Sequence, residues 1–219
     1  MSVEPHIVRP YQPADRAALR RIAADTADAG RPVENFFSDR EFVCDFISGY
    51  YTDVDPSETW VAESGGRVVG YLCGCFDTRR YLKAMSKRVV PGAIARGISR
   101  GLLWNPEAWR FVFAGIRTGL KSGNYRNKYL DRYPAHLHIN VDHTFRGTGA
   151  GGDLMDAFEK QAREAGLSGC HLGTRCDNES ARGFFERKGF RGVEEVDVYF
   201  PERSGLTVHR LCVYVKSYR

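Results

Sequence analysis

The sequence predicts a mixed α/β domain, and three observations predict it. Runs that alternate apolar and polar residues, as strands do, are interspersed with runs whose apolar residues recur every three or four positions, as on one face of a helix. One of those strands leads through a glycine-rich loop into a helix. Apolar residues make up 42% of the 219 residues, which is enough to form the core of one globular domain. We therefore expect a single domain over residues 1–219.

The N-terminal part predicts a short strand, two amphipathic helices and a β-hairpin, in that order. Apolar residues at helical spacing indicate the helices, and a Ser-Gly-Gly-Arg turn between two apolar runs indicates the hairpin. The expected elements are a strand at 6–9, a helix from Asp15, a helix at 41–51, and strands at 59–62 and 68–76.

The C-terminal part predicts strands and helices in alternation. A strand begins at Ala135 and is followed by a loop with four glycines and a helix that ends at Gly166. The elements that follow are a strand at 168–174, a helix at 178–188, and strands at 193–200 and 207–215.

The formal net charge of +5 is unevenly distributed along the chain. Residues 79–133 contain 13 basic and 2 acidic residues, a balance of +11, so the remainder has a balance of −6. This basic segment includes an amphipathic helical pattern at 107–122 and an apolar face formed by Ile94, Ile98 and Leu102. We expect a helical insertion at about 79–133. It suggests a lid over an acidic substrate or a dock for phosphates, and it is also consistent with an ordinary charged surface.

The six cysteines have neither zinc-ligand spacing nor a Cys-x-x-Cys pair, so we expect no metal site. We also expect no disulfide framework, a reducing compartment and a cytoplasmic location. Cys73 and Cys75 alternate in an apolar strand and are expected to be buried on one face. Residues 1–6 have no secretory pattern, and no apolar run is long enough to span a membrane.

The glycine-rich loop at 146–152 is suited to binding a phosphate. Glycines let backbone N–H groups approach a ligand closely, and the start of a helix adds unsatisfied donors. The Gly-Lys-Ser/Thr of a Walker loop is missing, because Gly152-Asp153 follows Gly151. A dinucleotide-binding string is present, but it lies late in the chain rather than in a first strand–helix unit. A turn without a ligand also remains open.

A second motif gives the loop its context. Arg146-x-x-Gly149-x-Gly151, followed by Asn178-x-x-Ala181-x-x-Phe184-Phe185 and Gly189-Phe190, resembles the GNAT superfamily of acetyl-CoA-dependent N-acetyltransferases. The resemblance implies a mixed, mostly antiparallel central sheet flanked by helices. Within the superfamily, His136-Leu137-His138-Ile139 and Gly169-x-His171-Leu172-Gly173 resemble the acetyltransferase-like domain of O-GlcNAcases and its free-standing relatives.

The resemblance also implies how the cofactor would bind. The backbone of Ile139 and Val141 would pair with the pantetheine arm, and Asn178, Ala181 and Phe184 would line its channel. An amine would then attack the thioester directly. The N–H groups that would hold the pyrophosphate are those of Arg146, Gly147, Thr148, Gly149, Ala150, Gly151 and Gly152.

The residues that would move protons are less well specified. Many members of the superfamily have a Tyr where this chain has Phe185, which cannot donate a proton to the leaving thiolate. Tyr199 or Tyr214 could take over that role, unless it is an aromatic residue packed within its strand. His136, His138, Asn140 and Asp142 share one side of their strand. We expect His138 to be the base, then Asp142, then Glu63, unless the stripe is simply hydrogen-bonded core; we expect His171 to be structural.

The sequence therefore predicts a transferase that moves acetyl from acetyl-CoA to a small-molecule, peptide or amino-sugar amine. One alternative is a catalytically impaired module that binds CoA or a peptide or glycan partner. Another is a basic nucleic-acid or membrane-surface binder, although neither partner is expected, because no motif supports either. A homodimer is left open.

Overall fold

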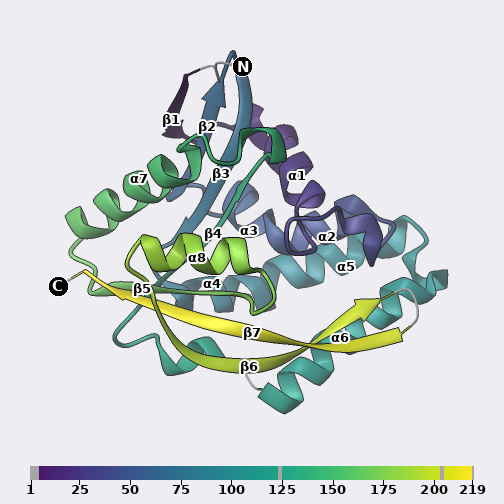
Figure 1. Ribbon diagram of the computed structural model, residues 1–219. Helices are drawn as coiled ribbons and strands as arrows, with labels where there is room; N and C mark the ends of the chain where they lie inside the picture. The colour runs from purple at the N-terminus through teal and green to yellow at the C-terminus, as the bar shows by residue number, and fades with distance from the viewer. Residues whose placement is uncertain (1–4, 123–124, 203–204, 219) are drawn as a thin grey trace.

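The computed structural model describes residues 5–122, 125–202 and 205–218; the first four residues, part of the stretch without a secretory pattern, lie outside this range. Its centre is a seven-stranded sheet with the order β1-β2-β3-β4-β5-β7-β6 (Figure 1). All neighbouring strands are antiparallel except β4 and β5. The expected mixed, mostly antiparallel sheet is thus confirmed. The strands are β1 (His6–Pro10), β2 (Thr59–Ser64), β3 (Arg67–Cys75), β4 (Ala135–Val141), β5 (Gly169–Arg175), β6 (Arg191–Glu202) and β7 (Gly205–Ser217).

Helices cover both faces of the sheet (Figure 1). The expected helix at 41–51 is interrupted at Ser48, whose backbone leaves helical geometry (φ −120°) and whose hydroxyl donates to the Cys44 carbonyl. This interruption divides the helix into α2 and α3. The α-helices are α1 (Arg16–Asp25), α2 (Arg40–Ile47), α3 (Gly49–Asp53), α4 (Thr78–Ala84), α5 (Val90–Ser99), α6 (Pro106–Ser122), α7 (Ala150–Glu164) and α8 (Glu179–Arg187).

Alternation along β3 divides the core into two layers. Tyr71, Cys73 and Cys75 pack with α1, α2 and α3 on one face of the sheet. Leu72 packs on the other face, with α7 and α8. Cys73 and Cys75 are buried on the same face, as the period of two predicts. The sheet is therefore covered on both sides where it leads to the site.

The sheet opens between its two parallel strands. The β4–β5 pairing consists of Ala135 with Cys170 and His136 with His171. Beyond that point β4 stays on β3 as far as Val141, and β5 stays on β7 as far as Arg175, so β4 and β5 diverge. The divergence exposes the side of β4 that faces β5 over the residues that the resemblance assigns to cofactor binding.

Between β3 and β4, where the sequence predicts a helical insertion at about 79–133, the described residues are mostly helical. They form α4, α5 and α6 and short helical turns, including η4 (Leu102–Trp104) and η5 (Tyr125–Lys128). The predicted helix over 107–122 corresponds to α6. Within the described residues, no helix is both long enough and apolar enough to cross a membrane.

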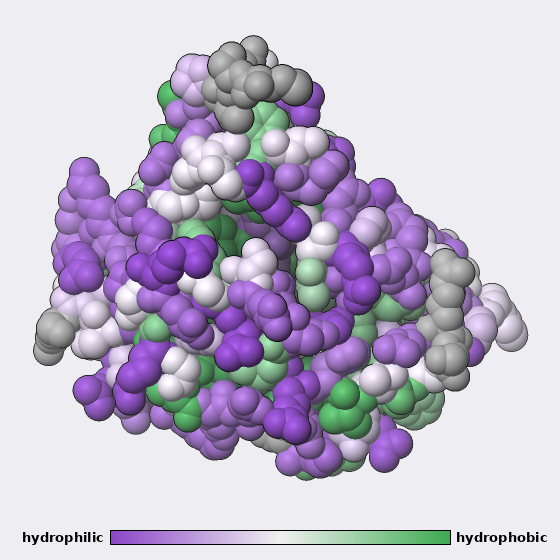
Figure 2. Space-filling model, viewed as in Figure 1, coloured by the Kyte–Doolittle hydropathy of each residue, from purple (hydrophilic) through white to green (hydrophobic). Residues whose placement is uncertain are grey.

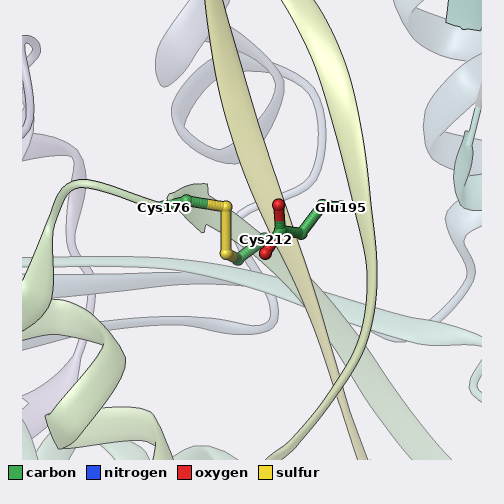
Figure 3. A group of neighbouring side chains, drawn as sticks. All are labelled: Cys176, Glu195 and Cys212. Atoms are coloured by element: carbon green, nitrogen blue, oxygen red, sulfur yellow. A yellow bond between two sulfur atoms is a disulfide. The ribbon is translucent and has the colours of Figure 1, made fainter.

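One expectation about the cysteines is wrong, because Cys176 and Cys212 form a disulfide (Figure 3). The chain leaves β5 at Arg175, and Cys176 then lies 5.1 Å from Cys212 between their Cα atoms. Glu195 is the cross-strand partner of Cys212, and its carboxylate lies beside the bond. Because the register of β5, β7 and β6 creates this proximity, no local spacing could reveal it. The described free cysteines are Cys44, Cys73, Cys75 and Cys170, all buried.

Candidate active site

Two clefts meet where β4 and β5 diverge. The larger has a volume of about 550 Å³ and lies between the glycine loop, β4 and α8. The smaller, of about 250 Å³, extends toward β5, β6 and β7. The clefts share part of their lining, which marks the junction between them. The shared residues are Ala29, Gly30, Ile139, Asn140, Asn178, Ala181 and Phe185.

The glycine loop leaves the first amides of α7 without a side-chain cap. Other helices begin at an acidic or amide residue: Asp39, Asp77 and Asn178 each accept a hydrogen bond from a backbone N–H of α2, α4 and α8. In contrast, α7 begins at Gly149, which has a φ of +95° and no side chain. Within the described part of the chain, no side chain accepts from the amides of 150–152. These N–H groups are directed at whatever binds there, and the helix dipole favours an anion.

The larger cleft is also electropositive. Arg146, Arg187 and Lys188 line it, and no acidic residue is among its described lining residues. The Lys188 ammonium bonds to Asp156 at 2.7 Å, and the Arg146 guanidinium reaches the Gly30 carbonyl at 3.4 Å. Sequence reasoning missed Arg187 and Lys188, because basic residues at the end of a helix are also ordinary dipole partners. The sequence did contain a signal for Lys188, because it follows Ala181 and Phe184 at helical spacing and so shares their side of the helix.

Most of the residues predicted to bind the cofactor line this larger cleft. The exceptions are Thr148, whose hydroxyl donates to the Phe145 carbonyl, and Ala150, which is buried. Asn178 lines both clefts while its side chain caps α8 through the Ala181 N–H at 3.1 Å. Predicted residues in the larger cleft are Ile139, Val141, Arg146, Gly147, Gly149, Gly151, Gly152, Asn178, Ala181 and Phe184.

The polar stripe of β4 has two different environments. His136 is buried between the Tyr51 hydroxyl at 2.8 Å and the Thr78 hydroxyl at 2.7 Å, so both ring nitrogens have partners inside the core. His138 and Asn140 instead line the smaller cleft. The Asn140 amide lies 3.0 Å from His138 Nε2 and donates to the Tyr71 hydroxyl at 2.9 Å. The stripe is therefore structural at its start and faces a cavity farther along.

His138 is neutral at physiological pH. Burial, together with the positive charge of Arg126, lowers the pKa of its imidazole to about 4. A neutral imidazole can accept a hydrogen bond or a proton, whereas an imidazolium cannot. His171 is fully buried, and its Nδ1 lies 2.8 Å from the Tyr133 carbonyl, which is a structural role.

The other two candidate bases lie away from both clefts. Asp142 is buried where β4 ends; it accepts from the backbone N–H of Thr144 at 3.2 Å and pairs with Arg21 at 3.2 Å. Despite burial, these bonds lower the pKa of its carboxyl, and together with the Thr144 hydroxyl they engage both carboxylate oxygens. Glu63 pairs with Arg9 at 2.7 Å on the hairpin. The geometry gives neither residue access to the junction.

Neither cleft contains a tyrosine within its described lining. Phe185, where the resemblance implies a proton-donating Tyr, is buried and lines both clefts. The Tyr214 hydroxyl donates to Glu186 at 2.9 Å, and the ring of Tyr199 is covered by Arg117 at 4.8 Å. Both are packed strand aromatics, so neither replaces the missing donor.

The insertion does not reach the clefts. None of the described residues of 79–133 lines either one. The lining of the clefts therefore gives no support to a lid or to a dock for phosphates, and both stay predictions. Residues of the insertion instead contact the histidines behind the clefts. The Tyr81 ring lies 4.5 Å from the His136 ring between centroids. The charge of Arg126 in η5 adds to burial in lowering the pKa of His136, His138 and His171.

A split sheet with an anion-binding loop at the mouth of the split defines the GNAT class of acyltransferases. The model of the acetyltransferase (GNAT) family matches residues 16–190, so the chain belongs to that family.

Solved structures agree with this assignment. SsHAT is 25% identical with a TM-score of 0.72, covering 97% of this chain and 98% of that one. The polyamine N-acetyltransferase of Drosophila melanogaster, which forms N-acetylagmatine, is 17% identical with a TM-score of 0.59, covering 97% of this chain and 100% of that one. The yncA protein of Salmonella typhimurium, solved with acetyl-CoA, is 13% identical with a TM-score of 0.57, covering 98% and 94%.

Acetyl-CoA is the cofactor of this family, and the larger cleft fits it. A Cβ added to Gly151 would lie 3.6 Å from both Phe184 and Val141, at ordinary contact distance, so the loop lies beside α8 and β4 along the cleft. Basic side chains and unsatisfied amides provide the complementary charge.

Proposed function

We propose that this protein transfers an acetyl group from acetyl-CoA to an amine by direct attack of the amine on the thioester. One observation carries the proposal: a basic cleft with uncapped amides and a second cleft, lined by His138, share their lining at Ile139 and Asn140. Two reactants that meet at such a junction need mainly orientation and a deprotonated amine. Acetyl-CoA supplies the activated acetyl group.

The residues of the larger cleft would bind and orient the cofactor. Amides of 147–152 would hold its pyrophosphate, with Arg146, Arg187 and Lys188 near its phosphates. Beyond His136, β4 has no strand partner on its β5 side among the described residues, so the backbone of Ile139 and Val141 can pair with the pantetheine arm. An amide there would donate to the thioester oxygen as negative charge develops.

His138 would accept the proton of the attacking amine. The C–N bond forms as the C–S bond breaks, and the nitrogen must lose one proton. His138 is uncharged at neutral pH and lines the acceptor side of the junction, held near Asn140. The thiolate would take its proton from water, because Phe185 has none to donate.

The class of acceptor is constrained by what lines the smaller cleft. No carboxylate is among its described lining residues; Thr174, Arg175 and His209 line it together with Phe200. The amine would thus be held by hydrogen bonds and packing rather than by an ion pair. Small-molecule, peptide and amino-sugar amines all stay candidates. The narrower relationship to the O-GlcNAcase-associated domain stays a hypothesis.

Gly151→Asp tests the cofactor half of this proposal. Asp is favourable in the first turn of a helix, and the added Cβ meets only ordinary contacts, so folding should be unaffected. A carboxylate in the cradle should weaken acetyl-CoA binding by about 100-fold, measured by calorimetry. Gly151→Ala is the matched control and should bind within a few-fold of the parent protein. Equal affinity of Gly151→Asp would refute the cleft as the cofactor site.

Release of CoA thiol over a panel of amines, peptides and amino sugars tests the transfer. His138→Ala should reduce kcat while leaving acetyl-CoA affinity unchanged, and the pH profile should lose its acidic limb. Cofactor binding with no turnover on any acceptor would instead identify a binding module.

A further inference from the structure

Helix α6 has two apolar faces, and only one of them is packed. On the packed face Phe111 contacts the rings of Phe37, Phe42 and Phe46, with centroids 5.6, 5.6 and 5.2 Å away. Ala108 and Ala114 are buried on the same helix. These contacts are sufficient to hold α6 on the domain, so its other apolar face needs a separate explanation.

The second face is a continuous line of large side chains on the surface. Trp109, Phe113, Ile116 and Leu120 recur at intervals of four, three and four residues, which aligns them along one side of the helix. They are 47%, 54%, 51% and 83% exposed, and Trp104 in the preceding η4 is 90% exposed. We call these five residues the α6 stripe.

The stripe is a concentrated feature of the molecule. Most large apolar residues that are exposed in the described part lie between residues 94 and 120. The Trp109 indole donates to the Leu103 carbonyl at 3.0 Å, which joins α6 to η4. In Figure 2, hydrophobic atoms come to the surface in the lower right of the view, the region where Figure 1 has α6. An apolar patch of this kind on a soluble domain indicates a partner.

The charge beside the stripe indicates what kind of partner. Arg110, Arg117 and Lys121 lie together on one flank of α6, within the segment whose balance is +11. Arg117 covers the Tyr199 ring and Lys121 pairs with Asp197 at 2.9 Å, while Arg110 makes no ion pair with another described residue. Earlier in the insertion, Lys83, Lys87 and Arg88 are likewise without a carboxylate partner in the described ranges. The partner is therefore expected to be anionic.

We propose that α6 and η4 dock on an anionic lipid surface, with the α6 stripe in the interface between headgroups and acyl chains. An amphipathic helix with Trp, Phe and Leu on one side and Arg and Lys beside them has the composition of helices that lie in this interface. Trp favours that depth because its ring is apolar and its N–H is polar. The basic excess is attracted to an anionic leaflet.

A second copy of this chain fits the surface less well. A two-fold contact would bring the same face of α6 against itself, and with it the same basic flank. The like charges would oppose that contact, whereas a leaflet of anionic lipid would neutralise them.

Docking through α6 would also fix the orientation of the smaller cleft. The Thr118 hydroxyl accepts from the Tyr199 N–H at 2.8 Å, which attaches α6 to β6. Val198 and Phe200, on either side of Tyr199, line the smaller cleft. The cleft is therefore one strand away from the docking helix and would stay close to the lipid surface.

Co-sedimentation with vesicles tests the proposal on the full chain. We expect binding to phosphatidylcholine vesicles that contain phosphatidylserine, little binding to pure phosphatidylcholine, and weaker binding as salt is raised. Leu120→Glu should reduce the partition coefficient by at least about ten-fold, because it removes an apolar group that would be buried in the lipid and adds a negative charge. Ile7→Glu is the matched control, since Ile7 is 61% exposed on β1, away from the stripe; it should bind as the parent does.

Three results would overturn the proposal: no sedimentation with anionic vesicles, equal sedimentation with neutral ones, or unchanged binding by Leu120→Glu. A concentration-dependent dimer in analytical ultracentrifugation that Leu120→Glu abolishes would assign the stripe to a second copy instead. Thermal melts of both variants establish that they are folded. The test does not involve acetyl transfer, so its outcome is independent of the proposed activity.

Discussion

The larger cleft and the insertion are both basic, but their charges are arranged in opposite ways. In the cleft, Arg146, Arg187 and Lys188 surround uncapped amides, and the charge is directed inward at a space of about 550 Å³. In the insertion, the basic residues lie outside the clefts, and Arg110, Arg117 and Lys121 flank the exposed α6 stripe. The comparison teaches that the sign of a charge identifies the partner's charge, while its surroundings decide between a small ligand and an extended surface.

The largest expected effect on stability comes from the disulfide beside the clefts. The Cys176–Cys212 disulfide joins residues 36 apart and lies two positions before Asn178, at the junction of the clefts. Cys176→Ser with Cys212→Ser should lower the free energy of unfolding by about 3–4 kcal/mol, because the unfolded chain regains loop freedom. Urea unfolding without reductant measures it. Reductant should lower the urea midpoint of the parent to that of the double variant. If the oxidised parent, the reduced parent and the double variant have the same midpoint, the prediction is wrong.

On the insertion side, two neighbouring aromatics separate packing from docking. Phe111→Ala should cost about 3 kcal/mol of unfolding free energy, because it leaves a cavity among three aromatic rings. Phe113→Ala should change the stability by less than about 0.5 kcal/mol, because the side chain is 54% exposed. Thermal denaturation of both variants tests this. A large loss from Phe113→Ala would show that the stripe is part of the fold, and the contrast between the two faces would fail.

Local spacing in the sequence predicted the elements of the cleft well. The glycine loop, β4, α7 and α8 are contiguous or nearly so, and a period of two or of about 3.6 identifies which of their residues share a side. The resemblance to the GNAT superfamily assigned Ile139, Gly149 and Phe184 to cofactor binding, and all three line the larger cleft. Lys188 was within reach of the helical period.

What was missed depends on elements that are distant in the sequence. Asp142 has the same alternation as His138 and Asn140. It lies just past the end of β4, however, and pairs with Arg21 from α1. Cys176 meets Cys212 only because β5 pairs with β7. Periodicity also assigned an apolar face to α6 without telling that the face is exposed, since burial depends on what packs against it.

The pH dependence of stability sharpens the comparison, because it tests how the charge of Arg126 in the insertion acts on the histidines of β4. Burial and Arg126 keep the pKa of His138 and of His171 at about 4, and that of His136 well below its usual value. An unfolded His takes up its proton near pH 6.5, so between there and pH 4 the unfolded state binds more protons. Stability should therefore fall between pH 7 and pH 5, by about 2 kcal/mol for each of His138 and His171 and further through His136.

Urea midpoints at pH 7, 6 and 5 measure this slope. His138→Gln and Arg126→Gln should each reduce it, whereas His143→Gln should not, because the His143 side chain is 80% exposed. A slope that is the same in all four proteins would show that the buried histidines do not control it.

The smallest effect is the most direct test of the comparison, because it removes one cation from each region. Arg187→Ala should weaken acetyl-CoA binding by about ten-fold, the value of one charge-assisted contact to a phosphate. Arg88→Ala should leave the affinity unchanged, since Arg88 is exposed in the insertion and lines neither cleft. Calorimetry at two salt concentrations measures both, and raising the salt should narrow the difference. If Arg88→Ala weakens binding as much as Arg187→Ala, the two regions act through net charge alone and the inward arrangement of the cleft has no special role.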